Sequence, residues 1–193
     1  MTNTPEPYAL AFANTMRQEG GYCDVIGDKG GETYRGISRV FWPSWEGWKL
    51  VDDWKGGAIA SAALSAALDP LVMQFYRVNF WDRFQGDAVA ALSVDIACEL
   101  FDTAVNMGVT TAVKFLQTSL NMQNQYGKTY PDIAVDGVLG KGTLQTLKRY
   151  LSWQPGNALD NEQILLNCMN GEQYIAYKNN AQHERFRGWF RRI

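Results

Sequence analysis

The chain has one histidine, His183, among its 193 residues. It therefore cannot build a zinc site with two histidine ligands, and carboxylates alone are poor zinc ligands. Three cysteines are present without a Cys-x-x-Cys pair, and their odd number predicts reduced thiols, not a disulfide framework. The sequence contains no Gly-x-Ser-x-Gly elbow and no phosphate-binding glycine pattern. We therefore expect no metal and no cofactor, and the chemistry that remains is that of carboxylates.

The chain also lacks a strong net charge and long hydrophobic runs. The net charge is -2, with 18 basic and 20 acidic residues, and a nucleic-acid partner would require a basic field. The most apolar run, Ala58 to Leu68, is far shorter than the roughly 20 residues that span a bilayer, so we expect no transmembrane segment. No basic stretch precedes an apolar one at the N-terminus, which predicts synthesis in the cytoplasm without a signal peptide.

Hydrophobic residues recur at helical spacing along most of the chain. Tyr8, Ala11, Phe12, Thr15 and Met16 line one face of a first helix, and Leu92, Ile96 and Leu100 form a later stripe. Further helices are expected at 59–68, from Asp69 with Pro70 at its first position, from Asp87, from a cap at Thr110 or Thr111, and at 142–152 and 161–183. The sequence therefore predicts a mainly α fold with at most a small β-hairpin near 22–37.

The most informative stretch follows the first helix. Its apolar face, continued from Tyr8 by about three turns, reaches Glu19, and Gly20-Gly21 then ends the helix. Burial raises the pKa of a carboxyl group, as a general acid requires. Asp28 supplies a second carboxylate beyond a turn, an arrangement that cleaves glycosidic bonds, and the Thr33 hydroxyl is suited to holding a water. The alternative is a capped helix and a hairpin whose Asp and Thr bind turn amides.

The run from Glu19 to Ile37 resembles the signature of the glycoside hydrolase family 108 N-acetylmuramidases, which occur in phage endolysins and secretion activator proteins. That signature is Glu-Gly-Gly-Tyr, a short spacer, Asp-x-Gly-Gly-x-Thr, and then Gly-Ile, and residues 19–22, 28–33 and 36–37 match it. The resemblance implies a lysozyme-like helical fold. It also implies that Glu19 is the catalytic acid. From the arrangement of the residues we expect Asp28 to be the base or water holder and Thr33 to be a supporting water ligand.

Downstream segments continue the resemblance. Residues 76–82 are similar to the family's Tyr-Arg…Tyr-Trp element, and residues 101–117 and 136–144 look like the associated peptidoglycan-binding segment. We expect a catalytic lobe at 1–95 and a helical peptidoglycan-binding lobe at 96–193, packed around a shared core as one compact unit. Asp102 and Asn106, four apart on one helix face, either reach the cleft or make structural hydrogen bonds. The predicted substrate-binding residues are Tyr22, Arg35, Tyr76, Trp81, Asp102, Asn106 and Gln117.

These features predict a bacteriolytic N-acetylmuramidase that hydrolyses the β-1,4 bond between N-acetylmuramic acid and N-acetylglucosamine. Its partner is the peptidoglycan glycan strand, which it reaches outside the cytoplasm as an endolysin released through a holin, or through an export pore. Two other readings stay open, a non-catalytic peptidoglycan-binding or secretion-regulating protein and a lytic transglycosylase that uses Glu19 alone. The tryptophans at positions 42, 45, 48 and 54 either stack on sugar or pack in the core.

Overall fold

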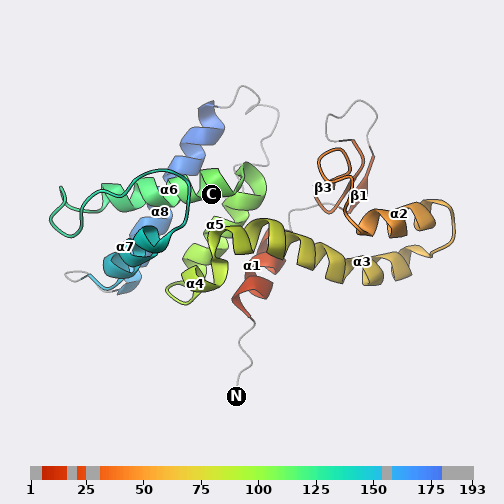
Figure 1. The fold of residues 1–193 in the computed structure, drawn as a ribbon, viewed down its shortest axis with the longest axis horizontal. Helices are drawn as coiled ribbons and strands as arrows, with labels where there is room; N and C mark the ends of the chain where they lie inside the picture. The colour runs from red at the N-terminus through yellow and green to blue at the C-terminus, as the bar shows by residue number, and fades with distance from the viewer. Residues whose placement is uncertain (1–5, 17–20, 25–30, 154–157, 180–193) are drawn as a thin grey trace, which may run out of the picture. The chain divides into compact units, whose positions relative to one another are not determined.

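The structure, a computed structural model, describes residues 6–16, 21–24, 31–153 and 158–179. Within these ranges the chain is mainly α-helical, which confirms the predicted fold class (Figure 1). The α-helices are α1 (Pro7–Met16), α2 (Gly47–Lys55), α3 (Ser61–Tyr76), α4 (Gly86–Ala90), α5 (Val94–Met107), α6 (Val109–Met122), α7 (Lys141–Leu151) and α8 (Ala158–Asn179). Three short strands are β1 (Tyr22–Cys23), β2 (Thr33–Tyr34) and β3 (Ile37–Ser38).

The chain divides into two compact units. The smaller unit comprises residues 12–79, and the larger unit comprises residues 1–11 and 80–193. The boundaries of these units differ from those of the lobes expected at 1–95 and 96–193. The division into a catalytic and a peptidoglycan-binding lobe stays a prediction.

In the smaller unit the three strands form one antiparallel sheet in the order β1-β2-β3. Tyr22 pairs with Tyr34, and Tyr34 pairs in turn with Ile37 across a two-residue loop. The loop residues Arg35 and Gly36 both have positive φ, 44° and 78°, which is the backbone that a tight type I′ hairpin requires. The predicted hairpin near 22–37 is therefore confirmed and is extended by a third strand.

Helix α3 continues without interruption through Pro70, so the prediction of two helices divided at Asp69 is wrong. Proline inside a helix removes one hydrogen bond and costs about 3 kcal/mol. Four side chains on this helix, Leu64, Leu68, Val72 and Phe75, are nevertheless buried on one continuous face. Burying each contributes about 1.5–3 kcal/mol, so together they outweigh the cost of the proline.

Aromatic rings make up much of the larger unit's core. The ring of Trp81 lies 5.4 Å from that of Tyr8, 5.5 Å from Phe84 and 5.9 Å from Phe101, measured between centroids. Helix α5 packs against α4, α6 and α8 around this core. The apolar face predicted for the first helix is confirmed at Tyr8 and Ala11, both buried.

Two helix starts differ from the prediction. The helix expected from Asp87 is two helices, because the Ser93 hydroxyl accepts a hydrogen bond from Ile96 N–H at 3.0 Å and caps a new helix, α5. Helix α6 begins at Val109, before the predicted caps Thr110 and Thr111. Its N-cap is Gly108, whose φ of 90° glycine adopts without strain. Helices α7 and α8 lie where helices were expected. None of the helices in the described ranges is both long and apolar enough to cross a membrane.

Candidate active site

The predicted catalytic residues are only partly covered by the structure. Glu19 and Asp28 lie outside the described residues. Thr33 is the first residue of β2, pairs with Cys23, and donates a 3.4 Å hydrogen bond from its hydroxyl to the Cys23 carbonyl. The carbonyl of Gly21 accepts a 3.1 Å hydrogen bond from Arg35 N–H. Gly21 is thus tied to the turn that joins β2 to β3.

Arg35 and Tyr76, both predicted to bind substrate, are brought together. The Tyr76 hydroxyl donates a 2.7 Å hydrogen bond to the Arg35 carbonyl, and the tyrosine is only 2% exposed. Tyr76 therefore ties the turn to helix α3. The Arg35 guanidinium forms a 2.9 Å ion pair with Asp69, in which both side chains keep solvent access. An exposed pair of this kind contributes about 0–1 kcal/mol, so it leaves the arginine available to a ligand.

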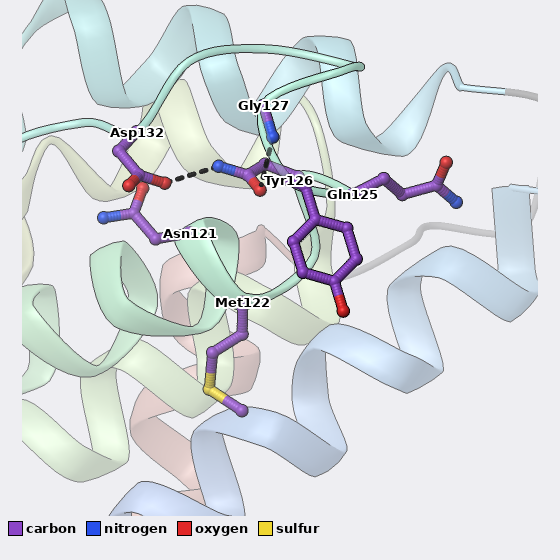
Figure 2. Close-up of a pocket in the computed structure, with 7 residues that line it drawn as sticks. Asn121, Met122, Gln125, Tyr126, Gly127 and Asp132 are labelled. Atoms are coloured by element: carbon purple, nitrogen blue, oxygen red, sulfur yellow. Dashed lines mark hydrogen bonds between the residues drawn. The ribbon is translucent and has the colours of Figure 1, made fainter.

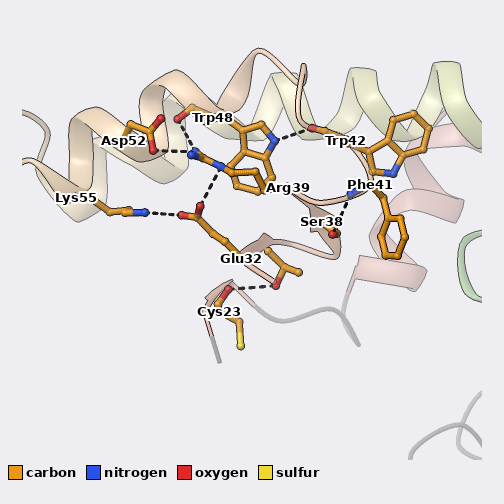
Figure 3. A network of polar contacts seen from close by, with 10 residues as sticks. Cys23, Glu32, Ser38, Arg39, Phe41, Trp42, Trp48, Asp52 and Lys55 are labelled. Carbon is orange, nitrogen blue, oxygen red and sulfur yellow. Dashed lines mark hydrogen bonds and ion pairs between the residues drawn. The ribbon is translucent and has the colours of Figure 1, made fainter. Parts of the chain in front are cut away.

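A carboxylate that the sequence did not single out, Glu32, organises the face of the sheet next to α2 (Figure 3). Its side chain is 10% exposed and forms ion pairs of 2.9 Å with Arg39 and 2.8 Å with Lys55. Arg39 also binds Asp52 at 2.8 Å and places its guanidinium 4.5 Å from the centroid of the Trp48 ring. These partners lie 7 to 23 positions away along the chain, and no local spacing rule could have found them. The network fixes the hairpin on helix α2.

Tyr22 belongs to the same network. Burial and a hydrogen bond to Glu32 raise the pKa of its phenol, so the hydroxyl stays protonated and serves as a donor. The ring meets Trp54 edge-on at 5.1 Å, and the Lys55 ammonium lies 6.0 Å from its centroid. Tyr22 thus supports the sheet, and its side chain is half-buried.

Three tryptophans in and before α2, at positions 42, 45 and 48, divide into two kinds. Trp45 and Trp48 are buried, with rings 5.1 Å apart, and pack in the core. Trp42 is 39% exposed and follows the exposed Val40 and Phe41. Of the three, Trp42 alone has the open surface that stacking on a sugar requires.

The remaining predicted substrate-binding residues lie in the larger unit and make structural contacts. Trp81 is fully buried and donates from its indole to Asp87 at 2.8 Å. The Asn106 amide donates to the Tyr177 hydroxyl, which agrees with the structural alternative for that residue. Asp102 is half-buried on the same helix. Because Trp81 is fully buried, it is not placed to contact a sugar directly. The role of Asp102 stays a prediction.

Gln117 holds the motif Asp136-Gly137 in place. It is 1% exposed, its amide donates to Asp136 at 2.9 Å, and its oxygen accepts from Gly137 N–H at 2.9 Å. The hydrogen bond from Gln117 lowers the pKa of Asp136. Gly137 has a φ of 77°, and a Cβ there would lie 2.5 Å from the Thr110 methyl. Because both polar groups of the Gln117 amide are used, the residue is better suited to shaping this loop than to binding a glycan.

A second carboxylate without a predicted role is Glu99 on α5. Its pKa is raised to about 7, chiefly by burial and also by the charge of Asp102, while a 3.1 Å hydrogen bond from Thr103 opposes the rise. Such a carboxyl group exchanges protons near neutral pH. Its position beside the predicted Leu92–Ile96–Leu100 stripe indicated partial burial, but no motif marked it. In the parts of the chain that the structure describes, no three acidic, histidine or cysteine side chains are grouped to hold a metal ion.

Comparison with known proteins identifies the family. The model of the family described as Glycosyl hydrolase 108 matches residues 12–108, half of the chain. The chain belongs to the glycosyl hydrolase 108 family. A second model, described as Predicted Peptidoglycan domain, matches residues 111–193. A glycosyl hydrolase 108 segment joined to a peptidoglycan domain makes this chain a peptidoglycan hydrolase.

Structural similarity extends over nearly the whole chain. The solved structure of Brucella abortus SagA is similar with a TM-score of 0.63 and 24% sequence identity. The match covers 96% of this chain and 88% of that one. At this identity the likeness concerns the fold. A comparison with curated protein sequences gave no match.

Proposed function

We propose that this glycosyl hydrolase 108 member is an N-acetylmuramidase, which hydrolyses the β-1,4 bond between N-acetylmuramic acid and N-acetylglucosamine. Glu19 protonates the leaving oxygen, Asp28 acts as the base that holds the attacking water, and Thr33 is a second ligand of that water. The observation that carries the proposal is the spacing of two carboxylates and a hydroxyl inside the span that the family model matches.

The described part of the smaller unit supports this assignment with a rigid frame. Asp28 belongs to the connection between β1 and β2, and Thr33 begins β2. Both ends of that connection are held, by the Tyr22–Tyr34 pair and by the Arg35–Gly21 hydrogen bond. Catalytic groups must be held close to their productive geometry, and Thr33 meets that demand as a residue of a paired strand.

We further propose that the enzyme is bacteriolytic, as an endolysin or an exported wall enzyme, and that a holin or an export pore releases it to the wall. The second match supports the wall as its place of action, because a peptidoglycan domain follows directly after the hydrolase segment.

Product analysis tests the proposal. Purified peptidoglycan is digested with the full chain, and the products are reduced with borohydride and identified by mass spectrometry. Muramidase action yields reduced N-acetylmuramic acid at the new ends. Reduced glucosamine ends would assign the other glycosidic bond, and anhydro-muramic ends would assign a lytic transglycosylase. An absence of soluble products from a folded protein that sediments with the wall would leave a binding protein only.

A further inference from the structure

A pocket of about 530 Å³ lies in the connection between α6 and α7, far along the chain from the candidate active site. Its size falls within the range of small-molecule sites, roughly 300–1,000 Å³. Figure 2 shows the side chains around it. They are Asn121, Met122, Asn124, Gln125, Tyr126 and Asp132, with the backbone of Gly127.

The backbone of this loop is left-handed at three consecutive residues. Gln125, Tyr126 and Gly127 have φ values of 55°, 59° and 78°. Only the glycine adopts this conformation freely, and each of the other two costs about 1–2 kcal/mol. Strain of this kind persists where surrounding contacts impose it, and it concentrates at functional sites.

Asn124 imposes the conformation. Its side-chain oxygen accepts from Gly127 N–H at 3.0 Å, and its amide donates to the Asp132 carboxylate. The Asn124 carbonyl accepts from the Thr129 hydroxyl at 2.7 Å and from the Thr129 N–H at 3.2 Å. The loop is therefore fixed from both sides of the strained residues.

This loop presents an aromatic ring to solvent from a backbone that hydrogen bonds hold in place. Tyr126 is fully exposed, and in Figure 2 its ring projects out of the loop, away from the hydrogen bond between Asn124 and Asp132. The thioether of Met122 is also largely exposed at the same pocket. A buried aromatic ring stabilises the fold by leaving water. The exposed Tyr126 ring makes no such contribution, and it would be buried only when a ligand binds.

The lining selects the chemistry of that ligand. No basic side chain lines the pocket, so it has no attraction for phosphate or carboxylate groups. Asp132 uses one oxygen for Asn124 and receives no second hydrogen bond from the described residues, and the amide of Gln125 is exposed. Acceptors and an amide beside a flat ring and a thioether suit a neutral ligand with hydroxyl groups, an amide and an apolar face. An N-acetylated hexose has all of these.

We propose that this pocket binds an N-acetylhexosamine unit of a glycan strand, with the Tyr126 ring stacked on the apolar face of the sugar. Met122 contacts the acetyl methyl group, and Asp132 accepts from a sugar hydroxyl. The inference deepens the proposed function, on which its choice of a wall glycan rests. The pocket lies in the segment matched as a peptidoglycan domain. It would give that segment a binding site for the glycan strand that is separate from the site of bond cleavage.

Methyl NMR on the full chain tests the proposal without relying on catalysis. The protein is labelled at its methionine methyl groups, the Met122 signal is assigned with Met122→Leu, and the chitin tetramer of N-acetylglucosamine is titrated in. The tetramer is shown to be intact afterwards by mass spectrometry. We expect a saturable shift of the Met122 signal. Tyr126→Ala should weaken the binding by about tenfold, the scale of one lost ring contact, and Tyr126→Phe should retain it.

Tyr174→Ala is the matched control, since Tyr174 is an exposed tyrosine of α8 that does not line the pocket, and this variant should bind as the unchanged protein does. An unmoved Met122 signal at the highest soluble tetramer concentration would overturn the proposal, as would equal affinity in Tyr126→Ala. A shift caused by a wall stem peptide and not by the tetramer would overturn the sugar assignment. The Met122 signal reports sugar binding at the pocket, whereas the product analysis reports bond cleavage. A failure of one proposal can therefore be distinguished from a failure of the other.

Discussion

The hydroxyl of Tyr76 donates a 2.7 Å hydrogen bond to the carbonyl of Arg35, 41 positions earlier in the chain. Arg35 in turn donates from its N–H to the Gly21 carbonyl. One buried tyrosine on α3 therefore supports the turn that joins β2 to β3 and, through it, Gly21. This link explains how a sheet of three two-residue strands is held in place.

The two buried tryptophans should be required for stability. Trp45→Ala and Trp48→Ala should each lower the free energy of unfolding by about 3–5 kcal/mol, because each removes a large ring from a packed core. Trp42→Ala is the matched comparison and should cost clearly less, since Trp42 is the exposed member of the three. Urea denaturation of the three single variants measures the difference. Equal losses in all three would contradict the assignment of Trp42 to the surface.

Alanine substitutions at two glycines with nearly equal φ values distinguish the cost of backbone strain from the cost of a steric clash. Gly127 and Gly137 have φ values of 78° and 77°, but a Cβ meets no atom within 4 Å at Gly127 and lies 2.5 Å from the Thr110 methyl at Gly137. Gly127→Ala should cost about 1–2 kcal/mol from backbone strain alone. Gly137→Ala should cost more, because a backbone carbonyl also lies 2.9 Å from the added methyl group. Thermal melts of the pair decide this, and equal melting temperatures would show that the loop yields at Thr110.

Glu99 should make stability depend on pH. Its pKa in the folded protein is about 7 against an ordinary value of 4.5, chiefly because it is buried. The folded state therefore keeps a proton that the unfolded state releases, and stability falls as the pH rises from about 4.5 to about 7. Glu99→Gln removes this loss. Relative to the unchanged protein, the variant should gain up to about 3 kcal/mol at pH 8 and nearly nothing at pH 4.

Urea denaturation at pH 4, 6 and 8 compares the two proteins. A difference between them that does not change with pH would show that Glu99 titrates normally in the folded state. Thr103→Val is a useful companion variant, because the Thr103 hydrogen bond lowers the pKa of Glu99 and its loss should widen the effect.

The mainly α fold was predictable because amphipathic helices carry their own pattern. The buried face at Tyr8 and Ala11 and the small sheet after Gly21 were both visible in the sequence. Local rules failed where tertiary burial opposed them. Pro70 indicated a helix boundary, but the apolar face of α3 continues through it.

The candidate site shows the same division. The motif from Glu19 to Thr33 was recognisable in the sequence, and the family match covers all of it. The network around Glu32 was not predictable, because its cationic partners Arg39 and Lys55 come from other elements. Gln117 was assigned to substrate by its place in a familiar segment, whereas its contacts fix the loop at Asp136 and Gly137. A residue that shapes a site and a residue that touches a ligand can occupy equally recognisable positions in a sequence.

The central claim, that Glu19 is the general acid, is tested most directly by Glu19→Gln assayed on purified peptidoglycan. The amide keeps the size of the side chain but cannot deliver a proton, so the rate of release of muropeptides should fall by at least about 100-fold. Circular dichroism and a thermal melt should show a folded protein. Glu6→Gln provides the control for loss of one carboxylate outside the candidate site, with the rate unchanged. A folded Glu19→Gln protein that releases muropeptides at nearly the original rate would contradict the account.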